Sequence, residues 1–450
     1  MYERIIEYAC IQLERSPDIV TGDRQISSKA AATLCACALT CRAWLRISRI
    51  CLYQKLRLTS ETDKRTVDSL IASLDANRAL RELVRDLWVV EARKRDEFRH
   101  SPAALSLRGN DYWHSWPALL AGKLPRLRRL NIHYEYNGEL ALHRACRMLL
   151  RQFSTIVELT FQWDAPVPFS SVAKFLASFP RLDRLSLDNP YYVDHASPSD
   201  QSHLHAALRA LPLIKYLRRT WEGLGEFPRK SLTDSLSREV FKALAPSVEI
   251  LDWVGNVNTR RYLVVRPRDR NPPQIGFSVC FPKLRIIRLH ASLTGDRPLQ
   301  HLSSWLLNLK ATCLQNVLLH LGLSSVMSVE HLLLNLTGVY HLDNALHNHH
   351  TTLVALTICV LLPYLSMELE AGYPAGSHCE PISVQAARRA LAVPTTIHLE
   401  SQLPLLARHG QLQVYICNGH GTPSIWVQAM PDGQIRSSRI PPPVFTELDL

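Results

Sequence analysis

A short pattern of apolar positions recurs along most of the chain beyond residue 60. The three clearest copies are Pro125–Ile132, Pro180–Leu187 and Pro282–Leu289, and each has the form apolar-x-x-apolar-x-apolar. Because side chains alternate along a strand, the end of this template places Leu130 and Ile132 on one face of a short β-strand. The pattern therefore predicts a series of short strands, each preceded by an apolar residue that turns in from a loop.

Weaker copies of the template extend the series. They carry apolar residues at Val84/Leu87/Val89, Ile156/Leu159/Phe161, Val248/Leu251/Trp253, Leu314/Val317/Leu319 and Leu353/Leu356/Ile358. A partial copy, Ile214/Leu217, ends in Arg219 instead of an apolar residue. The spacing between copies is irregular, but it is of the size found in repeat proteins.

Stretches with helical spacing lie between the copies. They are Leu140–Phe153, Val172–Phe179, His203–Leu211, Ser235–Leu244 and Leu299–Leu309. One short strand cannot bury its own face, so the units must stack. We therefore expect an α/β fold over residues 60–370, an irregular solenoid with parallel strands on one side and helices on the other. It resembles leucine-rich repeats loosely, because the copies lack the Asn or Cys ladder position of that family.

The two ends of the chain depart from the repeat. Residues 1–58 have apolar residues at helical spacing, in one set from Ile5 to Leu13 and in another from Leu34 to Leu45, with a loop predicted from Pro17 to about Ser28. A third short helix should precede a strand that begins at Lys55.

Residues 371–450 are expected to form a C-terminal cap and tail. A loop carries Gly372, Pro374, Gly376 and Pro381, and a helix is predicted over Val384–Ala392. Gln411–Cys417 and Ser424–Met430 alternate like the two strands of a hairpin.

The net charge, the first residues and the longest apolar run indicate whether the chain is exported or associates with a membrane. The 52 Lys and Arg exceed the 40 Asp and Glu, which gives a formal net charge of +12. The first residues carry Glu3, Arg4 and Glu7 where a secretory signal needs an apolar stretch, and the longest apolar run, Leu353 to Leu365, is too short to cross a bilayer. We expect no membrane association.

The cysteines bear on the compartment. There are 11 of them, scattered and without a CxxC. This pattern is not that of a secreted disulfide scaffold or a zinc ribbon, so a cytoplasmic or nuclear location is expected.

Residues 34–56, LCACALTCRAWLRISRICLYQKL, carry the most informative motif. The segment resembles the second half of an F-box, in particular that of the F-box-like proteins abundant in mushroom-forming fungi. In that family a Cys-Ala-Leu-x-Cys-Arg-x-Trp core precedes Ser-Arg-x-x-Leu-Tyr and a strand. Glu3–Tyr8 looks like the first F-box helix, so the resemblance covers residues 1–58. The chain departs from the family in having Met1-Tyr2 where Leu-Pro usually stands before that helix.

The resemblance implies a substrate-recognition adaptor of a cullin-RING (SCF-type) ubiquitin ligase. An F-box docks on the Skp-type linker protein through an apolar helical surface, and the repeats hold a protein target for ubiquitin transfer by other subunits. The chain would then be a monomer within a hetero-complex, with no catalytic activity and no cofactor of its own. The residues implied in partner binding are Ile5, Ile6, Leu34, Leu39, Trp44 and Leu45.

The residues themselves leave alternatives open. A segment of about 58 residues has little interior of its own, so some of its apolar side chains should dock elsewhere. They could dock on a partner or on the chain's own solenoid, and Trp44 could equally be a core residue between helices. The missing Leu-Pro favours a second interpretation, a repeat scaffold for protein–protein interaction with a degenerate F-box and no link to ubiquitin.

The sequence contains no motif that indicates a metal site or a catalytic site. Cys35, Cys37 and Cys41 are close in sequence but do not share one helical face, and His341, His347, His349 and His350 lack ligand-like spacing. Cys379 beside His378 is the nearest approach to a nucleophile with a base, but neighbours in sequence seldom have that geometry. We expect structural roles for all of them.

Basic clusters occur at Arg93–Arg95, at Arg126, Arg128 and Arg129, and at Arg260–Arg270. A nucleic-acid groove would need such cations clustered with aromatic residues that stack on bases. Many of these cations are instead interleaved with acids such as Glu91, Asp96 and Glu97, so we do not expect nucleic acid as a partner. Solvated repeat surfaces account for most of them, and an acidic protein target is the second possibility. A phosphorylated target is a hypothesis for Arg260–Arg270.

Overall fold

The structure is a computed structural model, and part of the chain can be described from it. The described residues are 24–59, 64–90, 115–134, 144–163, 169–188, 211–222, 242–256, 280–293, 303, 306–307, 309–323, 336, 339–347, 349, 352–362, 393–409, 411–418, 426–429 and 435–438. The chain divides into two compact units, Met1–Leu213 and Ile214–Leu450. Each unit is described separately.

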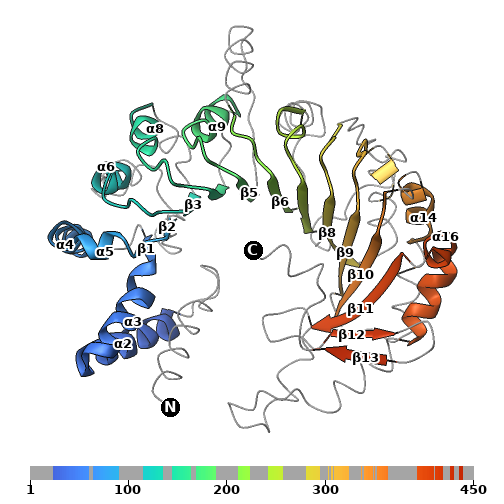
Figure 1. Cartoon of the computed structure of the whole chain (residues 1–450), viewed down its shortest axis with the longest axis horizontal. Coiled ribbons are helices and arrows are strands. Elements are labelled where there is room, and N and C mark those ends of the chain that lie inside the picture. The colour runs from blue at the N-terminus through green and yellow to red at the C-terminus, as the bar shows by residue number, and fades with distance from the viewer. Residues whose placement is uncertain are drawn as a thin grey trace, which may run out of the picture. The chain divides into compact units, whose positions relative to one another are not determined.

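The first unit is an α/β structure built on parallel strands. Its elements in chain order are α2 (Arg24–Thr40), α3 (Arg42–Gln54), β1 (Lys55–Thr59), α4 (Lys64–Ala76), α5 (Arg78–Arg81), β2 (Asp86–Val90), α6 (Trp116–Leu120), β3 (Arg129–Tyr134), α8 (Arg144–Leu150), β4 (Glu158–Trp163), α9 (Phe169–Leu176) and β5 (Arg184–Asp188). Each of these strands pairs in parallel with the next, from β1 to β5. Helices α4, α6, α8 and α9 lie on one side of the strands (Figure 1).

The second unit continues the same architecture and ends differently. Its elements are β6 (Tyr216–Glu222), β7 (Ile250–Asn256), β8 (Ile286–Leu293), β9 (Asn316–Leu323), α14 (Tyr340–His347), β10 (Ala355–Leu362), a helix over 393–402, α16 (Pro404–Arg408), β11 (Leu412–Asn418), β12 (Trp426–Ala429) and β13 (Ile435–Ser438). Strands β6 to β11 are parallel, whereas β12 and β13 are added antiparallel. Within each unit, parallel strands stack with helices between them, which confirms the predicted α/β solenoid.

The strand pairing matches the repeat template position by position. In the first unit the middle apolar positions are aligned as Leu87, Leu130, Leu159 and Leu185, and in the second as Leu217, Leu251, Ile287, Val317 and Leu356. The first template position is at most 3% exposed in every copy, at Val84, Leu127, Ile156, Leu182, Ile214, Val248, Leu284, Leu314 and Leu353. The copies read from sequence are therefore the stacked units of the fold.

A further apolar position of the repeat was not part of the predicted template. It lies three residues before the first template position and is buried at Leu124, Phe153, Phe179 and Phe281. In each case its carbonyl oxygen accepts a hydrogen bond from the amide three residues later, as in Leu127 N to Leu124 O at 3.2 Å. The residue that directly follows this position is Pro in three of the four copies, and Pro suits the second position of a β-turn because its φ is already fixed near the turn value.

A shared backbone carbonyl joins consecutive units. Arg85 O accepts from the amides of both Arg128 (2.8 Å) and Arg129 (3.0 Å), and Arg128 O accepts from those of Val157 (2.9 Å) and Glu158 (3.1 Å). The second unit repeats this arrangement, for example at Arg285 O. These bonds satisfy the polar backbone at the start of each strand without the side-chain ladder of regular leucine-rich repeats.

The N-terminal helices differ from the prediction in two ways. The spacing of Leu34, Ala38, Cys41 and Leu45 predicted one helical face, but Cys41 is extended (φ −157°, ψ 161°) and separates α2 from α3. The predicted loop to about Ser28 was also too long, because α2 already begins at Arg24. The predicted strand is confirmed, because Lys55–Thr59 forms β1.

Other helix and cap predictions have mixed outcomes. Leu140–Phe153 and Val172–Phe179 correspond to α8 and α9; His203–Leu211, Ser235–Leu244, Leu299–Leu309 and Val384–Ala392 fall wholly or largely outside the described residues. The predicted hairpin is confirmed by the antiparallel pairing of β11 and β12. The predicted domain boundaries at residues 58 and 370 stay predictions.

Polar contacts fix two helix ends. At α16 both carboxylate oxygens of Asp343, from α14, accept hydrogen bonds from the amides of Leu405 and Leu406, each at 3.2 Å. These amides have no partner inside the helix, so Asp343 caps α16 from another element. At the other kind of helix end, the guanidinium of Arg81 donates hydrogen bonds to the last carbonyl oxygens of α4.

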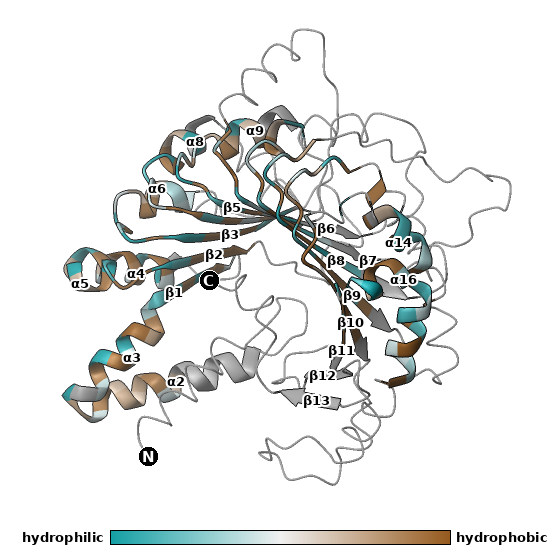
Figure 2. Ribbon diagram, turned by 45° about the vertical axis from the view of Figure 1, so that its right-hand side comes forward, coloured by the Kyte–Doolittle hydropathy of each residue, from teal (hydrophilic) through white to brown (hydrophobic). Residues whose placement is uncertain are grey.

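Hydropathy follows this architecture. In Figure 2 hydrophobic and hydrophilic segments alternate along α3, α4 and α16, as expected of helices that bury one face. Among the described residues, no helix is long and apolar enough to span a membrane.

Candidate protein-interaction surfaces

Helices α2 and α3 pack on each other through a small apolar core. Leu34 is fully buried and Cys37 is 6% exposed, and both lie against Trp44, Cys51 and Leu52. The contacts come from one face of α2 and from the side of α3 that carries Trp44 and Cys51. The pair α2–α3, together with β1, is called the helical module below.

The opposite face of α2 is apolar and exposed. Ala32, Cys35, Ala36 and Leu39 follow one another at spacings of three, one and three residues, which places them on one stripe of the helix. All four are exposed, and Leu39 is 89% exposed. Such a stripe, named here the α2 stripe, is the arrangement by which a helix anchors in an apolar groove.

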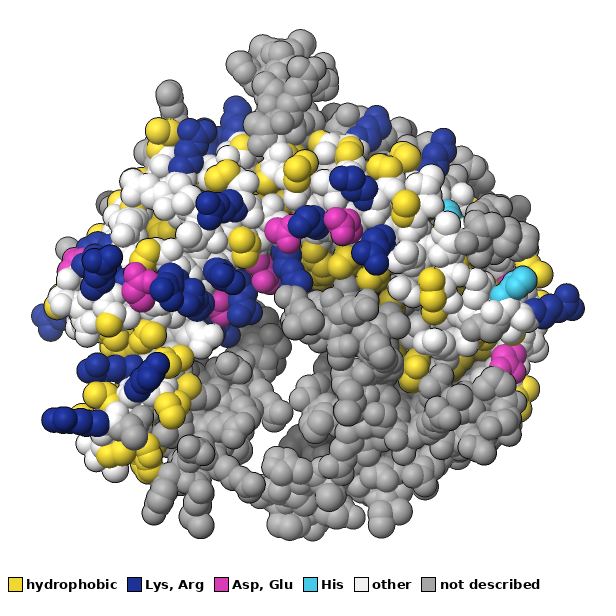
Figure 3. Space-filling model, viewed as in Figure 1, with side chains coloured by type: hydrophobic (Ala, Val, Ile, Leu, Met, Phe, Trp, Pro, Cys, Tyr) yellow, Lys and Arg dark blue, Asp and Glu magenta, His cyan; other side chains and the backbone are white. Residues whose placement is uncertain are grey.

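Helix α3 exposes cations. Arg42, Arg46 and Arg49 are separated by four and three residues and therefore line one side of the helix, away from Trp44 and Cys51. They form the α3 arginine row. In Figure 3 basic side chains project from the place of α2 and α3 among hydrophobic ones, and no acidic side chain is visible there.

The structure separates the residues predicted to bind a partner. Ile5 and Ile6 lie outside the described residues. Leu34 is fully buried in the core of the module, whereas Leu39 is exposed. Trp44 and Leu45 are half-buried, and Trp44 packs on the Leu34 core.

The strand face of the first unit that points away from the core carries a row of alternating charge. Lys55, Asp86, Arg129, Glu158 and Arg184 are neighbours in register across β1 to β5. Arg129 Nε lies 2.8 Å from Asp86 Oδ1, and Lys55 Nζ lies 4.5 Å from the centre of the Trp88 ring. The row presents paired charges of both signs on this strand face, and it also stabilises the sheet through cross-strand attraction.

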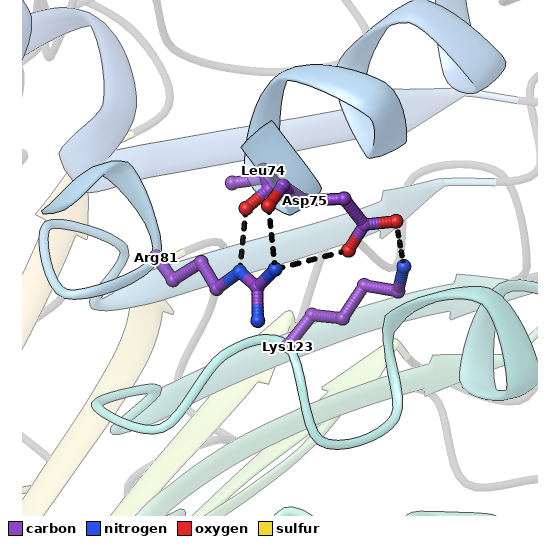
Figure 4. Close-up of polar contacts among 4 residues, drawn as sticks. All are labelled: Leu74, Asp75, Arg81 and Lys123. Atoms are coloured by element: carbon purple, nitrogen blue, oxygen red, sulfur yellow. Dashed lines mark hydrogen bonds and ion pairs between the residues drawn. The ribbon is translucent and has the colours of Figure 1, made fainter. Parts of the chain in front are cut away.

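A second polar cluster joins repeats at their helical side. Arg81 Nε donates to Leu74 O (2.5 Å) and Arg81 Nη2 donates to Asp75 O (2.9 Å), so the guanidinium caps the last carbonyls of α4. Asp75 in turn accepts from Arg81 Nη2 at 3.2 Å and pairs with Lys123 of the following repeat (Figure 4). All cations here have partners, so the cluster is structural.

The second unit has a buried polar network on its strand face. Asp252 is only 3% exposed. Its Oδ2 accepts a hydrogen bond from Tyr216 Oη at 2.8 Å and lies 4.0 Å from Arg218 Nε. Its Oδ1 lies 3.2 Å from His290 Nε2. Burial alone would raise the pKa of Asp252, but the close contact with His290, the charge of Arg218 and the hydrogen bond from Tyr216 bring it below its usual value. The carboxylate is therefore kept ionised.

The same network extends along β8 and β9. His320 stacks on His290 with 4.3 Å between ring centres. Burial, followed by the charges of His290 and Arg288, lowers the pKa of His320 to about 3. Burial and the hydrogen bond to Asp252 raise the pKa of Tyr216. The network thus connects side chains of four neighbouring strands, β6 to β9, and it singles out no reactive atom.

The remaining candidates do not form a site. Cys37 is buried while Cys35 and Cys41 are exposed, and burial lowers the pKa of the partly buried His349. Within the described part of the chain, no group of three or more His, Cys, Asp or Glu could hold a metal ion. Arg93–Arg95, Arg260–Arg270 and the His378-Cys379 pair lie outside that part.

Cys51 is disulfide-bonded. Disulfides are uncommon in reducing compartments. This bond weighs against the cytoplasmic or nuclear location expected from the sequence, which stays a prediction.

Two features of these surfaces were missed in the sequence. The spacing of Arg42, Arg46 and Arg49, four and three residues, is the sequence signal for a row of cations on one side of a helix. Aligning the repeat copies on their middle position would have placed Arg218, Asp252 and Arg288 in one row across β6, β7 and β8.

Comparisons with known proteins do not assign the chain to a family. No protein-family model matches it, and no curated protein matches it. Among solved structures, the crystal structure of a Bacteroides fragilis protein, a structural-genomics target, is similar over 68% of this chain with 12% identity and a TM-score of 0.28. The chain spans 64% of the length of that protein.

Proposed function

We propose that the protein is a substrate-recognition adaptor of a cullin-RING (SCF-type) ubiquitin ligase. The helical module docks on the Skp-type linker protein, and the solenoid binds a protein target. One observation carries the proposal: a two-helix module with the exposed apolar α2 stripe leads directly into β1, which pairs with β2 of the solenoid.

The α2 stripe supports a partner-binding role on physical grounds. Leu39 at 89% exposure is the most exposed large apolar side chain of the described residues, and burying a Leu side chain stabilises by about 1.5–3 kcal/mol. A partner that covers Leu39 together with the small residues of the stripe obtains this stabilisation and a close approach to the helix backbone. Leu39 is thus the residue of the module on which linker binding should depend most.

The strand faces support the capture of a protein target. They present paired charges in the first unit and a polar network in the second, and repeat proteins use such extended faces to bind other proteins. Ubiquitin transfer would belong to other subunits, so the chain itself would be neither an enzyme nor a cofactor-binding protein. The complex would act in the cytoplasm or nucleus.

One observation favours a second candidate, a repeat scaffold with no link to ubiquitin. Leu34, which the resemblance implies in partner binding, is fully buried in the module's own core. A module that buries its apolar side chains in its own core does not depend on a partner protein to cover them.

The adaptor proposal is tested by co-expressing the full chain with the host's Skp-type linker and recovering the complex by pull-down. Leu39→Asp should reduce the recovered linker at least tenfold, because a carboxylate replaces the central apolar contact and cannot be buried unpaired. Leu34→Asp is unsuitable, since that change would disrupt the module's core.

Ile397→Asp is the matched control, because Ile397 is also an exposed apolar residue of a helix, with 61% exposure, and lies in the second unit. It should leave linker recovery unchanged. Circular dichroism of each variant checks that it is folded. Equal recovery with folded Leu39→Asp, or no recovery with the wild-type chain, would contradict the proposal and leave the scaffold.

A further inference from the structure

The α3 arginine row is not explained by the stability of its own helix. Arg42 is the first residue of α3, where the helix dipole is positive and a cation is unfavourable. The stretch from Arg24 to Ser60 contains seven Lys or Arg and no Asp or Glu. Neither α2 nor α3 can therefore offer these arginines an ion pair within a helix.

The side chains of the row are also available. Arg42, Arg46 and Arg49 are exposed, and no salt bridge among the described residues involves them. Elsewhere in the first unit cations do have acidic partners, as Arg126 has in Glu82 at 2.5 Å and Arg129 has in Asp86. The module is distinguished by three aligned cations with no such partner in the part of the chain that the structure describes.

We infer that the α3 arginine row binds an acidic segment of the partner protein that docks on the helical module. This inference rests on the proposed function and adds the chemistry of the partner's surface: carboxylates spaced to meet three guanidinium groups along about two turns of helix. The apolar α2 stripe supplies contact energy, and the row supplies attraction at a distance and orientation. Leu39 lies three residues before Arg42, so the apolar stripe and the cation row meet at the α2–α3 junction.

Two other anionic partners fit the surface less well. A helix that lies on a membrane needs a broad exposed apolar face. Helix α3 has its apolar side against α2, and among its described side chains Ile47, at 42%, is the one large apolar residue that is exposed. Single-stranded nucleic acid is held by exposed aromatic residues that stack on bases. The module's Trp44 and Tyr53 are half-buried.

The inference is tested by measuring the association rate of the full chain with the purified Skp-type linker at about 50 and 300 mM salt, where screening differs strongly. Reversing the row with Arg42→Glu, Arg46→Glu and Arg49→Glu should lower the association rate on the order of 10-fold or more at low salt. It should also remove most of the salt dependence seen with the wild-type chain.

A matched variant controls for net charge. Arg151→Glu, Lys174→Glu and Arg181→Glu reverse three other exposed cations of the first unit, and this variant should keep the wild-type rate within about twofold, since the charges lie outside the row. Thermal unfolding of both variants verifies that they fold.

Each outcome decides the inference. Unchanged linker association in the row variant would overturn it while leaving the adaptor proposal intact. Equal losses in both variants would also overturn it, because net charge and not the row would be responsible. No linker binding by the wild-type chain would overturn both.

Two further probes test the competing partners. Row-dependent binding to vesicles of 30% phosphatidylserine, or to a 20-nucleotide poly-dT, without row-dependent linker association would overturn the inference in favour of a membrane or nucleic acid.

Discussion

Replacing Phe175 by alanine lowers the free energy of unfolding of the first unit by about 3–5 kcal/mol, the range for truncating a core aromatic residue. Phe175 is completely buried in α9. Its ring centre lies 4.9 Å from that of Phe161 on β4 and 5.3 Å from that of Phe179 in the turn before β5. The change removes a ring that joins a helix to two consecutive repeat positions, and it leaves a cavity.

The measurement is urea unfolding monitored by circular dichroism, with Lys174→Ala as the control. Lys174 is the neighbour of Phe175 on α9 but is exposed, so its truncation should change the unfolding free energy by less than about 0.5 kcal/mol. If Phe175→Ala cost no more than the Lys174 control, the placement of α9 against the strands would be wrong.

Acid should destabilise the second unit through His320. Unfolded, this imidazole takes up a proton below its ordinary pKa of 6.5, whereas in the folded unit burial delays uptake to about pH 3. Between these values the unfolded state binds more protons, so stability falls as the pH falls, by up to about 1.4 kcal/mol for each pH unit. Asp252 acts in the same direction at lower pH, since its pKa in the folded state is below 3.8.

The variant His320→Phe separates the contribution of His320 to acid destabilisation from that of Asp252. The variant keeps a ring that can stack on His290, but this ring cannot bind a proton. Between pH 6.5 and 4.5 the wild-type chain should therefore lose about 2 kcal/mol more unfolding free energy than the variant. His409→Gln is the control, because His409 is exposed. An identical pH dependence of the unfolding free energy in wild type and His320→Phe would contradict the lowered pKa of His320 in the folded unit.

The repeat strands could be predicted because each copy carries its own signal. Leu130 and Ile132 are buried for the same reason in every unit, and a three-residue alternation is enough to show it. The extra buried position at Leu124, Phe153, Phe179 and Phe281 was not found, because the template was started one turn too late. The solenoid thus followed from short-range patterns that stacking satisfies.

The features that depend on contacts between distant residues could not be predicted. Nothing local marks a helix break at Cys41, because no Gly or Pro stands there and the apolar spacing runs through it. The addition of β11 to β10 in parallel depends on pairing between residues 56 positions apart, for example Leu356 with Leu412.

The candidate interaction surface was predicted only in part. Leu34 and Leu39 are both apolar residues of α2, five positions apart and therefore on different faces. Which face meets α3 is decided by the packing of Trp44 on Leu34, a contact that spacing does not reveal. The arginine row does not stand out as a cluster in the sequence, because its members are four and three residues apart and come together only on one side of a helix.

The adaptor role is tested most directly by asking whether the chain joins a cullin only through the linker. Purified full chain, Skp-type linker and the N-terminal region of the host cullin are mixed in pairs and together, and the complexes are separated by size-exclusion chromatography with light scattering. The account predicts one 1:1:1 complex when all three are present and no complex of chain and cullin without the linker. Leu39→Asp should be absent from the ternary complex. A folded wild-type chain that elutes alone while linker and cullin elute together would contradict the account.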